Sequence, residues 1–263
     1  MASGRNYTLL ANETPFDFDA RISFDEDRHI YWVDGEQVPI SVTGVLKKHD
    51  PAPFDAPKII TRCWKAWKMN GKKPELAEVL VGVQDDETAI VQVQKVWSRS
   101  SELGTLLHKR FEALMNGEPT DIPEFAPVNG DWDQLVNALK GVDWYPHRSE
   151  LSVFYTNKFG KVVAAGQIDS LAVDDENDDY VMIDLKRSSK EIGPAQTPFR
   201  PGEWTEFYKY SLQLSCYSLM VAQLTGKQVK PHNRYLLVVD SSRAYWVRCL
   251  DLDDKAREML EGL

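Results

Sequence analysis

Three closely spaced β-rich segments in the second half of the chain constrain its fold more than any other feature. Residues 151–155, 162–173 and 180–185 are rich in valine, isoleucine and aromatic residues, and only short turn signals separate them. Because connections this short join antiparallel neighbours, the pattern predicts a three-stranded meander. Residues 234–240 and 244–250 have the same character and predict two more strands.

Helical patterns lie on both sides of these strands in the sequence. Residues 204–224 and 253–263 have apolar side chains at helical spacing and follow the meander and the last strand. Residues 87–115 form a longer helical pattern ahead of the sheet. Since a sheet with apolar faces needs helices to cover them, the predicted fold class is α/β, with a central mixed sheet of about five strands flanked by helices.

The first hundred residues predict an elaboration of this core. Residues 29–33 and 37–42 flank Asp34-Gly35, a strong turn signal, and predict a β-hairpin. Residues 58–70 and 75–83 predict two helices. We therefore expect one domain over residues 1–263, with the hairpin and helices in residues 1–99 and the core in residues 100–250.

Composition narrows the class of protein. Of 263 residues, 43% are hydrophobic and 27% charged, as in an ordinary globular protein, and no apolar run is long enough for a membrane span or a secretion signal. We therefore expect a cytoplasmic protein with no membrane partner. The three cysteines, Cys63, Cys216 and Cys249, lack the spacing of a disulfide framework or a zinc ribbon, which indicates reduced thiols.

The net charge of −9 argues against a protein that coats nucleic acid without specificity. The charge is unevenly placed, because residues 47–73 carry a net +6 and the remainder −15. The turn at residues 174–179 has five acids in six positions, but it lacks the glycine and the terminal glutamate of an EF-hand calcium loop. We interpret this turn as a solvated hairpin tip.

Two adjacent predicted strands carry the residues that indicate chemistry. Asp184 and Lys186 share one face of a strand because side chains alternate, and Asp169 on the neighbouring strand can meet Asp184. Carboxylates gathered in this way suit Mg²⁺ or Mn²⁺, which prefer oxygen ligands. Lys186 can then orient a water molecule and offset charge that builds on a phosphate.

Two predicted helices carry polar groups four residues apart. Gly104, His108 and Glu112 share one helical face, and the imidazole could be a further metal ligand. Gln213 and Tyr217 are spaced in the same way on the helix that follows the lysine strand, and they could hold a phosphate or a base. Each pair alone would more often reflect ordinary helix packing.

The ordered series of motifs resembles the PD-(D/E)XK nuclease superfamily, specifically its RecB-like exonuclease branch. The resemblance covers roughly residues 100–220 and rests on Gly104-x-x-x-His108, Gly166-x-x-Asp169, Asp184-x-Lys186 and Gln213-x-x-x-Tyr217. It implies a restriction-endonuclease-like core. Some relatives hold an iron–sulfur cluster with four cysteines, but this chain has three, so we expect no such cluster.

The resemblance also implies the roles of individual residues. His108, Asp169 and Asp184 would bind the metal together with the backbone carbonyl of Leu185, and Lys186 would be the catalytic lysine. Glu150 lies where many members carry a further catalytic glutamate. Gln213 and Tyr217 would border the DNA path.

Basic residues suggest two courses for bound DNA. Lys58, Arg62 and Lys65 form a stripe interleaved with Trp64 and Trp67, a combination that suits single-stranded DNA, although such a stripe is usually a solvated helix face. The other course follows the segment after the catalytic strand, which contains Arg187, Ser188, Lys190 and Arg200.

The sequence therefore predicts a divalent-metal-dependent DNA nuclease, most simply an exonuclease of recombination, replication or repair. A recombination or replication protein is an expected partner, and a phage-encoded version would act in the host cytoplasm. Two alternatives stay open: a nucleic-acid-binding protein with an inactive nuclease core, and an acidic protein that mimics DNA. Metal-dependent degradation of labelled DNA distinguishes the three.

Overall fold

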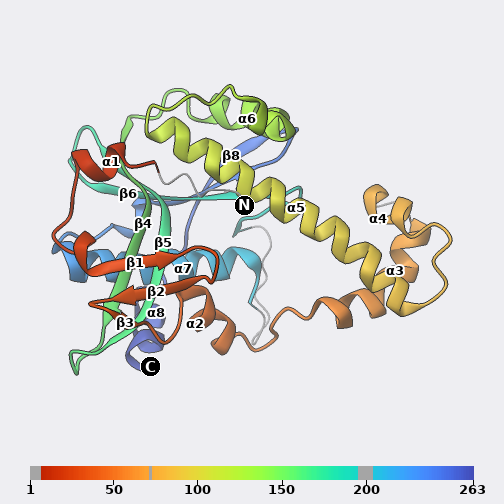
Figure 1. The fold of residues 1–263 in the computed structure, drawn as a ribbon, viewed down its shortest axis with the longest axis horizontal. Helices are drawn as coiled ribbons and strands as arrows, with labels where there is room; N and C mark the ends of the chain where they lie inside the picture. The colour runs from red at the N-terminus through yellow and green to blue at the C-terminus, as the bar shows by residue number, and fades with distance from the viewer. Residues whose placement is uncertain (1–6, 71–72, 195–203) are drawn as a thin grey trace. The chain divides into compact units, whose positions relative to one another are not determined.

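The computed structural model describes residues 7–70, 73–194 and 204–263 (Figure 1). The chain divides into two compact units. Unit 1 contains Met1–Pro51 and Leu107–Leu263, and unit 2 contains Ala52–Leu106. The predicted hairpin therefore groups with the sheet, whereas the predicted boundary at residue 99 falls inside a continuous helix. Within the described residues, no helix is both long enough and apolar enough to cross a membrane.

Unit 1 contains most of the secondary structure. Its N-terminal part forms a short helix and a small three-stranded antiparallel sheet, followed by a helix: α1 (Leu9–Glu13), β1 (Ile22–Asp25), β2 (Ile30–Val33), β3 (Glu36–Gln37) and α2 (Val42–His49). The remaining elements build the central layer and its covering helices: α6 (Asn129–Ala138), β4 (Trp144–Thr156), β5 (Val162–Asp174), β6 (Tyr180–Arg187), α7 (Glu206–Thr225), β7 (Arg234–Val239), β8 (Ala244–Arg248) and α8 (Asp253–Glu261). Short 3₁₀ turns η1 (Asp19–Arg21), η2 (Pro123–Val128) and η4 (Pro231–Asn233) connect them.

The central sheet has five strands in the order β4-β5-β6-β7-β8. The first three strands form the predicted antiparallel meander. The β6–β7 pair is parallel, and α7 provides the crossover connection that parallel strands require. The predicted α/β class, with a mixed five-stranded sheet flanked by helices, is therefore confirmed.

Because side chains alternate along each strand, the two faces of this sheet pack against different helices. Leu236 and Val238 of β7 belong to the large core that contains α7 and α8 residues. Tyr235 and Trp246 face the other way, where the Trp246 indole donates to the carbonyl of Ala138 in α6. Because Asp184 and Lys186 pair in register with Leu236 and Val238, they lie on the α7 face.

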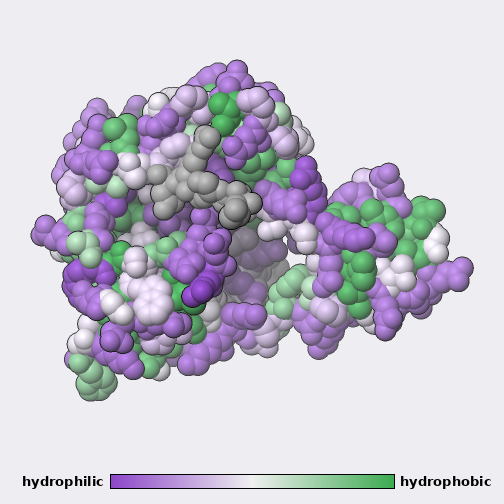
Figure 2. Space-filling view, viewed as in Figure 1, coloured by the Kyte–Doolittle hydropathy of each residue, from purple (hydrophilic) through white to green (hydrophobic). Residues whose placement is uncertain are grey.

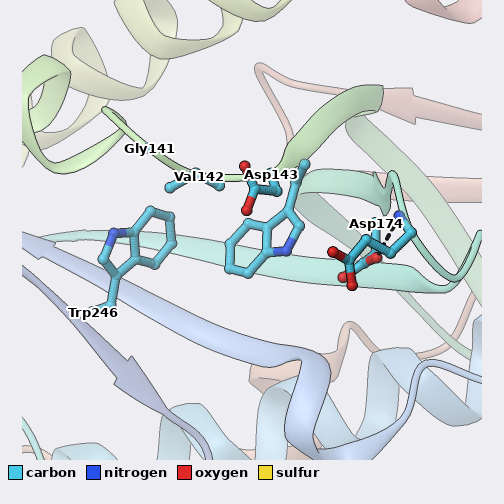
Figure 3. Close-up of a pocket in the computed structure, with 7 residues that line it drawn as sticks. Gly141, Val142, Asp143, Asp174 and Trp246 are labelled. Atoms are coloured by element: carbon cyan, nitrogen blue, oxygen red, sulfur yellow. Dashed lines mark hydrogen bonds between the residues drawn. The ribbon is translucent and has the colours of Figure 1, made fainter.

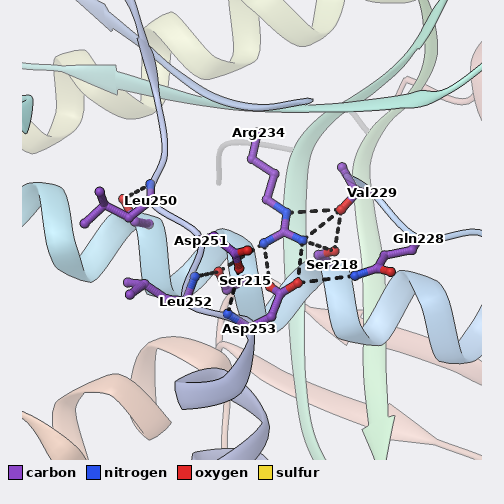
Figure 4. A network of polar contacts seen from close by, with 10 residues as sticks. Ser215, Ser218, Gln228, Val229, Arg234, Leu250, Asp251, Leu252 and Asp253 are labelled. Carbon is purple, nitrogen blue, oxygen red and sulfur yellow. Dashed lines mark hydrogen bonds and ion pairs between the residues drawn. The ribbon is translucent and has the colours of Figure 1, made fainter. Parts of the chain in front are cut away.

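A buried arginine joins the C-terminal elements (Figure 4). Arg234 at the start of β7 is fully buried, and its guanidinium forms two contacts with Asp253 at the start of α8. It also donates to Ser215 and Ser218 of α7. Because a buried charge is tolerated only when it is fully paired, this network fixes β7, α7 and α8 together.

Unit 2 is helical and has a small core of its own. It contains α3 (Ala56–Asn70), α4 (Pro74–Val79) and the first part of α5 (Asp86–Met115), which continues into unit 1. Ile60, Trp64 and Leu80 are among its buried residues, and Trp64 donates to Asp86. Its surface shows apolar residues among hydrophilic ones (Figure 2), and Phe54, Met69, Val81 and Val91 are exposed.

Two sequence predictions are wrong in detail. Val42 begins α2 instead of ending the hairpin, because the Ser41 side chain accepts a hydrogen bond from the backbone of Gly44 and caps the helix. The sequence also missed β1, which pairs with β2 but is rich in polar residues. The loop predicted at residues 194–202 lies almost wholly outside the described residues.

Candidate metal centre

Three adjacent strands bring three carboxylates to one region of the α7 face. The pairs Ser149↔Ser170 and Leu151↔Ile168 flank Glu150 on β4 and place it opposite Asp169 on β5. The next pair along, Ser170↔Ile183, places Asp169 level with Asp184 on β6. The register of the meander therefore gathers residues that are far apart in the sequence.

The strands β5 and β6 stop pairing where the site begins. Their ladder ends at Ser170↔Ile183, and beyond it the Asp169 carboxylate accepts a 2.8 Å hydrogen bond from the backbone N–H of Leu185. This contact satisfies a donor that the ended ladder would leave unpaired. Because the N–H and C=O of a strand residue point to the same side, we expect the Leu185 carbonyl on the Asp169 side as well.

Asp184 and Lys186 form a close pair at the end of β6. Lys186 Nζ lies 2.7 Å from Oδ2 of Asp184, whose side chain is almost completely buried. Burial raises the pKa of Asp184 to about 6, although Lys186 opposes this shift. Burial alone would lower the pKa of Lys186, but Asp184 and Asp169 outweigh it and raise that pKa above its ordinary value. Lys186 is therefore held as an ammonium, and Nζ lies 4.8 Å from the centre of the Tyr210 ring.

His108 reaches the same carboxylates from the part of α5 that belongs to unit 1. Its Nδ1 lies 3.5 Å from Oδ2 of Asp169. One ligand atom each from His108, Glu150 and Asp169 lies within 4.8 Å of the others. Ligands on opposite sides of an octahedral Mg²⁺ are about 4.2 Å apart, so this spacing fits a small divalent cation.

The grouping differs partly from the predicted ligand set. Glu150, predicted as a catalytic residue, joins His108 and Asp169 directly. Asp184 is the neighbour of this group and is engaged by Lys186. The Lys186 ammonium lies at Oδ2 of this buried carboxylate, so a metal ion held by Asp184 would share the carboxylate with Lys186.

Glu150 adopts an unusual backbone conformation. Its φ angle is +45°, a left-handed value that costs energy for a residue with a side chain. The side chain of Gln167 donates a 3.1 Å hydrogen bond to the Glu150 carbonyl and supports this conformation. Burial raises the pKa of the Glu150 carboxyl well above its ordinary value, and the charges of Asp169 and Glu112 raise it further. A cation at this site would relieve that accumulation of negative charge.

Glu112 adds a further buried acid beside the group. It lies one helical turn beyond His108 and is 7% exposed. Burial raises its pKa to about 7, although a backbone hydrogen bond from Tyr7 opposes the shift. The helical spacing in the sequence therefore indicated a real juxtaposition of His108 and Glu112 with the strand acids.

The Gln213–Tyr217 pair has a clear packing function. Gln213 donates to the Tyr217 hydroxyl over 3.0 Å, and Tyr217 is buried. A Cβ atom at Gly166 would lie only 2.5 Å from the Tyr217 ring, so glycine is required there. Of the two residues predicted to border the DNA path, Gln213 is half-buried and reachable, whereas Tyr217 lies in the core.

The residues after β6 that the sequence predicted to bind DNA are engaged within the protein. Arg187 Nε donates to Asp131, a buried residue of α6, over 2.8 Å. Ser188 accepts a hydrogen bond from the backbone of Lys190, and Lys190 Nζ lies 3.5 Å from Glu206. Lys190 is exposed, whereas Arg187 is largely covered. Arg200 lies outside the described residues.

The basic stripe of α3 lies on the surface of unit 2. Lys58, Arg62 and Lys65 are all exposed, whereas Trp64 is buried and Trp67 half-buried. Lys65 Nζ lies 5.5 Å from the centre of the Trp64 ring. The tryptophans therefore build the unit's core, and the cations are the part of the stripe that solvent reaches.

Sequence reasoning missed two residues of the site. Gln167 was not predicted as a site residue, although it is the polar residue between Gly166 and Asp169 of the motif. Tyr210, which lies beside Lys186, comes one helical turn before Gln213. The helical spacing between Tyr210 and Gln213 would have indicated that both face the site. The function of Gln167 could not be predicted, because it supports the left-handed backbone of Glu150, which the sequence does not reveal.

The chain matches no protein-family model and no curated protein. Among solved structures, the crystal structure of SSO0001 aligns with 84% of this chain and 81% of that chain, at 16% sequence identity and a TM-score of 0.34. A likeness this weak carries no functional inference. The function therefore rests on the chemistry of the site.

Proposed function

We propose that the protein is a divalent-metal-dependent DNA nuclease of the PD-(D/E)XK type. The observation that carries this proposal is the convergence of His108, Glu150 and Asp169 beside the Asp184–Lys186 pair. A hard cation matches the carboxylates, and a lysine held as an ammonium suits a phosphate substrate. The ordered motifs that resemble the RecB-like branch favour an exonuclease of recombination, replication or repair.

The donor set fits Mg²⁺ or Mn²⁺. His108, Glu150, Asp169 and Asp184 would hold the ion, and we expect the Leu185 carbonyl on the same side. The bound ion would supply Lewis acidity and lower the pKa of a water molecule at the phosphate. Manganese accepts the imidazole of His108 more readily than magnesium, which prefers an all-oxygen shell.

The protein's own groups divide the remaining tasks. The ammonium of Lys186 lies at the carboxylate cluster, where it can orient the attacking water and offset charge on the phosphate oxygens. Tyr210 and Asp184 fix the position of this ammonium. Gln213 is only half-buried, so its amide could contact a phosphate or a base.

The rival functions each lack support from the site. An inactive nuclease core would not need a lysine and four acidic or imidazole groups gathered at one place, several of them at the cost of burial. A DNA mimic would display its acids on the surface, whereas Asp184 and Glu112 are buried. We therefore favour catalysis over binding alone.

A digestion experiment tests the function directly. DNA labelled at its 5′ or 3′ end would be supplied single-stranded, double-stranded, linear or circular, with Mg²⁺, Mn²⁺ or EDTA. We expect degradation of linear DNA with either metal and none with EDTA. Cleavage of circular DNA would show an endonuclease instead, and binding without cleavage would favour the inactive core.

Asp184→Asn tests the metal assignment without relying on activity. A neutral amide is a poor ligand for a hard cation, so Mn²⁺ binding measured by calorimetry should weaken by at least about tenfold. Asp131→Asn is the matched control, because Asp131 is an equally buried carboxylate paired with a cation, Arg187. Unchanged Mn²⁺ affinity in Asp184→Asn would remove Asp184 from the ligand set.

A further inference from the structure

A shallow hollow lies on unit 1, on the sheet face opposite the candidate metal centre. Its volume is about 310 Å³, and its lining comes from the start of β4, the end of β5, the turn after β5, and β8. Figure 3 shows Trp246 at one end, Asp174 at the other and Asp143 between them. Nothing in the proposed nuclease reaction uses these residues.

Aromatic rings form the apolar part of this hollow. Trp144 and Trp246 have ring centroids 5.5 Å apart with an interplanar angle of 86°, so their rings meet almost at right angles. The ring of Tyr235 on β7 has its centroid 5.0 Å from that of Trp144 and also contacts Trp246. Both indoles line the hollow and are only half-buried, so part of each ring is exposed to a bound group, and an indole face attracts cations.

Carboxylates form the polar part, and that of Asp174 also accepts hydrogen bonds from the backbone of Glu176 and Asn177. Asp143, Asp174 and Glu176 line the hollow. In the described part of the chain, none of these three is within ion-pair distance of a lysine, arginine or histidine. The acids farther along the same turn differ, because Asp178 pairs with Lys227 and Asp179 with Lys230.

The geometry of the carboxylates excludes two kinds of occupant. Among the described residues, the carboxylate and imidazole groups close enough to share a metal ion are those around Asp169, and the acids of the hollow are not among them. A small metal ion therefore lacks converging ligands here. Three carboxylates without an ion pair among the described residues repel phosphate groups, which argues against DNA as the occupant.

We propose that this hollow binds an arginine side chain from a basic peptide segment of a partner protein. A planar guanidinium stacks on an indole and donates to carboxylates at its edge, which matches the mixed lining of Trp144, Trp246, Asp143 and Glu176. The chain's own Arg248 lies over the neighbouring Tyr235 ring, 5.9 Å from its centroid, and does not line the hollow. Among the described residues, no lysine or arginine lines the hollow, which leaves the site to a cation from outside.

Titration with two matched peptides tests this site. One capped peptide contains arginine between glycines, and the other replaces arginine with citrulline, which has the same shape without the charge. The readout is the indole N–H resonances of Trp144 and Trp246 in ¹⁵N-labelled full-length protein, assigned with Trp144→Phe and Trp246→Phe. We expect the arginine peptide to shift both resonances and the citrulline peptide to shift neither.

Conservative variants test whether the carboxylates of the hollow are responsible for binding the arginine peptide. Asp143→Asn and Glu176→Gln should each weaken arginine-peptide binding about two- to fivefold, as loss of one exposed ion pair implies. Asp175→Asn is the control, because Asp175 is in the same turn but does not line the hollow. Nuclease activity should be unchanged in all three variants.

Three outcomes would overturn the proposal. Equal shifts with citrulline would show that charge plays no part. Equal weakening by Asp175→Asn would show general attraction to an acidic protein, and a lysine peptide that binds as tightly as the arginine peptide would contradict the assignment of a guanidinium. Absence of any shift at millimolar arginine peptide would show that the hollow is not a binding site.

Discussion

Among the residues of the site, Lys186 has the surroundings that most favour a catalytic function over a structural one. Two carboxylates and the Tyr210 ring surround its ammonium, and these contacts stabilise the charged form although the side chain is largely covered. A lysine with a structural function alone would need only one of these partners. The cluster instead holds a fixed positive charge beside the candidate metal centre, as the proposed phosphate substrate would require.

Replacing Lys186 with alanine tests this function. We expect Lys186→Ala to lower the cleavage rate by at least about 100-fold while DNA and Mn²⁺ binding stay near wild-type levels, because the ammonium acts mainly on the transition state. Single-turnover digestion and calorimetry measure the two effects separately. Lys161→Ala, which removes an exposed lysine that is not among the predicted DNA-binding residues, is the control. Near-wild-type turnover of Lys186→Ala would exclude Lys186 from the mechanism.

We expect Glu112 to make the stability of the metal-free protein depend on pH. Its pKa is about 7 in the folded protein because of burial, against an ordinary value of 4.5. Between these values the unfolded chain releases the proton and the folded protein retains it, so stability falls as pH rises. The difference corresponds to a loss of roughly 3 kcal/mol once pH exceeds the folded value.

Glu112→Gln should remove this part of the pH dependence. Urea unfolding at pH 5 and pH 8 in EDTA would show a smaller loss of stability in Glu112→Gln than in the wild-type protein. Part of the dependence should persist, because the pKa values of Asp184 and Glu150 are raised as well. Glu118→Gln, which changes an exposed acid, should leave the slope unchanged. An unaltered slope in Glu112→Gln would show that burial of Glu112 is relieved in solution.

At the scale of elements, the backbone conformation that positions the Glu150 carboxylate lowers the stability of β4. Glu150 interrupts an otherwise regular strand with a left-handed backbone. Alanine has the same backbone penalty as glutamate at this position, and glycine does not. We expect Glu150→Gly to be about 1 kcal/mol more stable than Glu150→Ala in urea unfolding, and both to lose nuclease activity. Equal stabilities would mean that the backbone of β4 relaxes once the carboxylate is removed.

The sequence predicted the elements of the sheet better than the conformations within them. Residues 162–173 and 180–185 have strongly β-prone side chains, and the structure places β5 and β6 there. The motif spacing also indicated that Asp169 and Asp184 would meet, because strand pairing follows from the short turn between them. The left-handed Glu150 could not be predicted, since it depends on Gln167 from another strand and on three-dimensional packing.

Surface roles were harder to predict than buried ones, because a sequence does not show which charges find partners. Arg187 was predicted to contact DNA, and the structure pairs it with Asp131, 56 positions earlier in the chain. Tyr217 was also predicted to border the DNA, and it packs on Gly166 in the core. Such long-range pairings form only when α6 and α7 are placed on the sheet.

At the scale of the whole molecule, the chain carries its chemistry and its most basic helix in different compact units. The candidate metal centre belongs to unit 1, and Lys58, Arg62 and Lys65 belong to unit 2. A protein with a net charge of −9 gains little general attraction to DNA, so a local basic surface would have to supply it. The exposed cations of α3 are the candidates, because their aromatic neighbours Trp64 and Trp67 are committed to the core.

Replacing Lys58, Arg62 and Lys65 together with glutamine tests whether unit 2 binds DNA. If each side chain neutralises a phosphate of single-stranded DNA, affinity should fall and the log–log salt dependence should flatten by about 0.7 for each phosphate no longer neutralised. Cleavage at saturating DNA should change much less, because the metal centre is intact. The control variant replaces three exposed lysines of unit 1 with glutamine: Lys140, Lys158 and Lys161. It therefore makes the same change in net charge. If both triple variants weaken binding equally, overall charge and not α3 governs the affinity, and if neither does, the DNA is held by groups nearer Lys186.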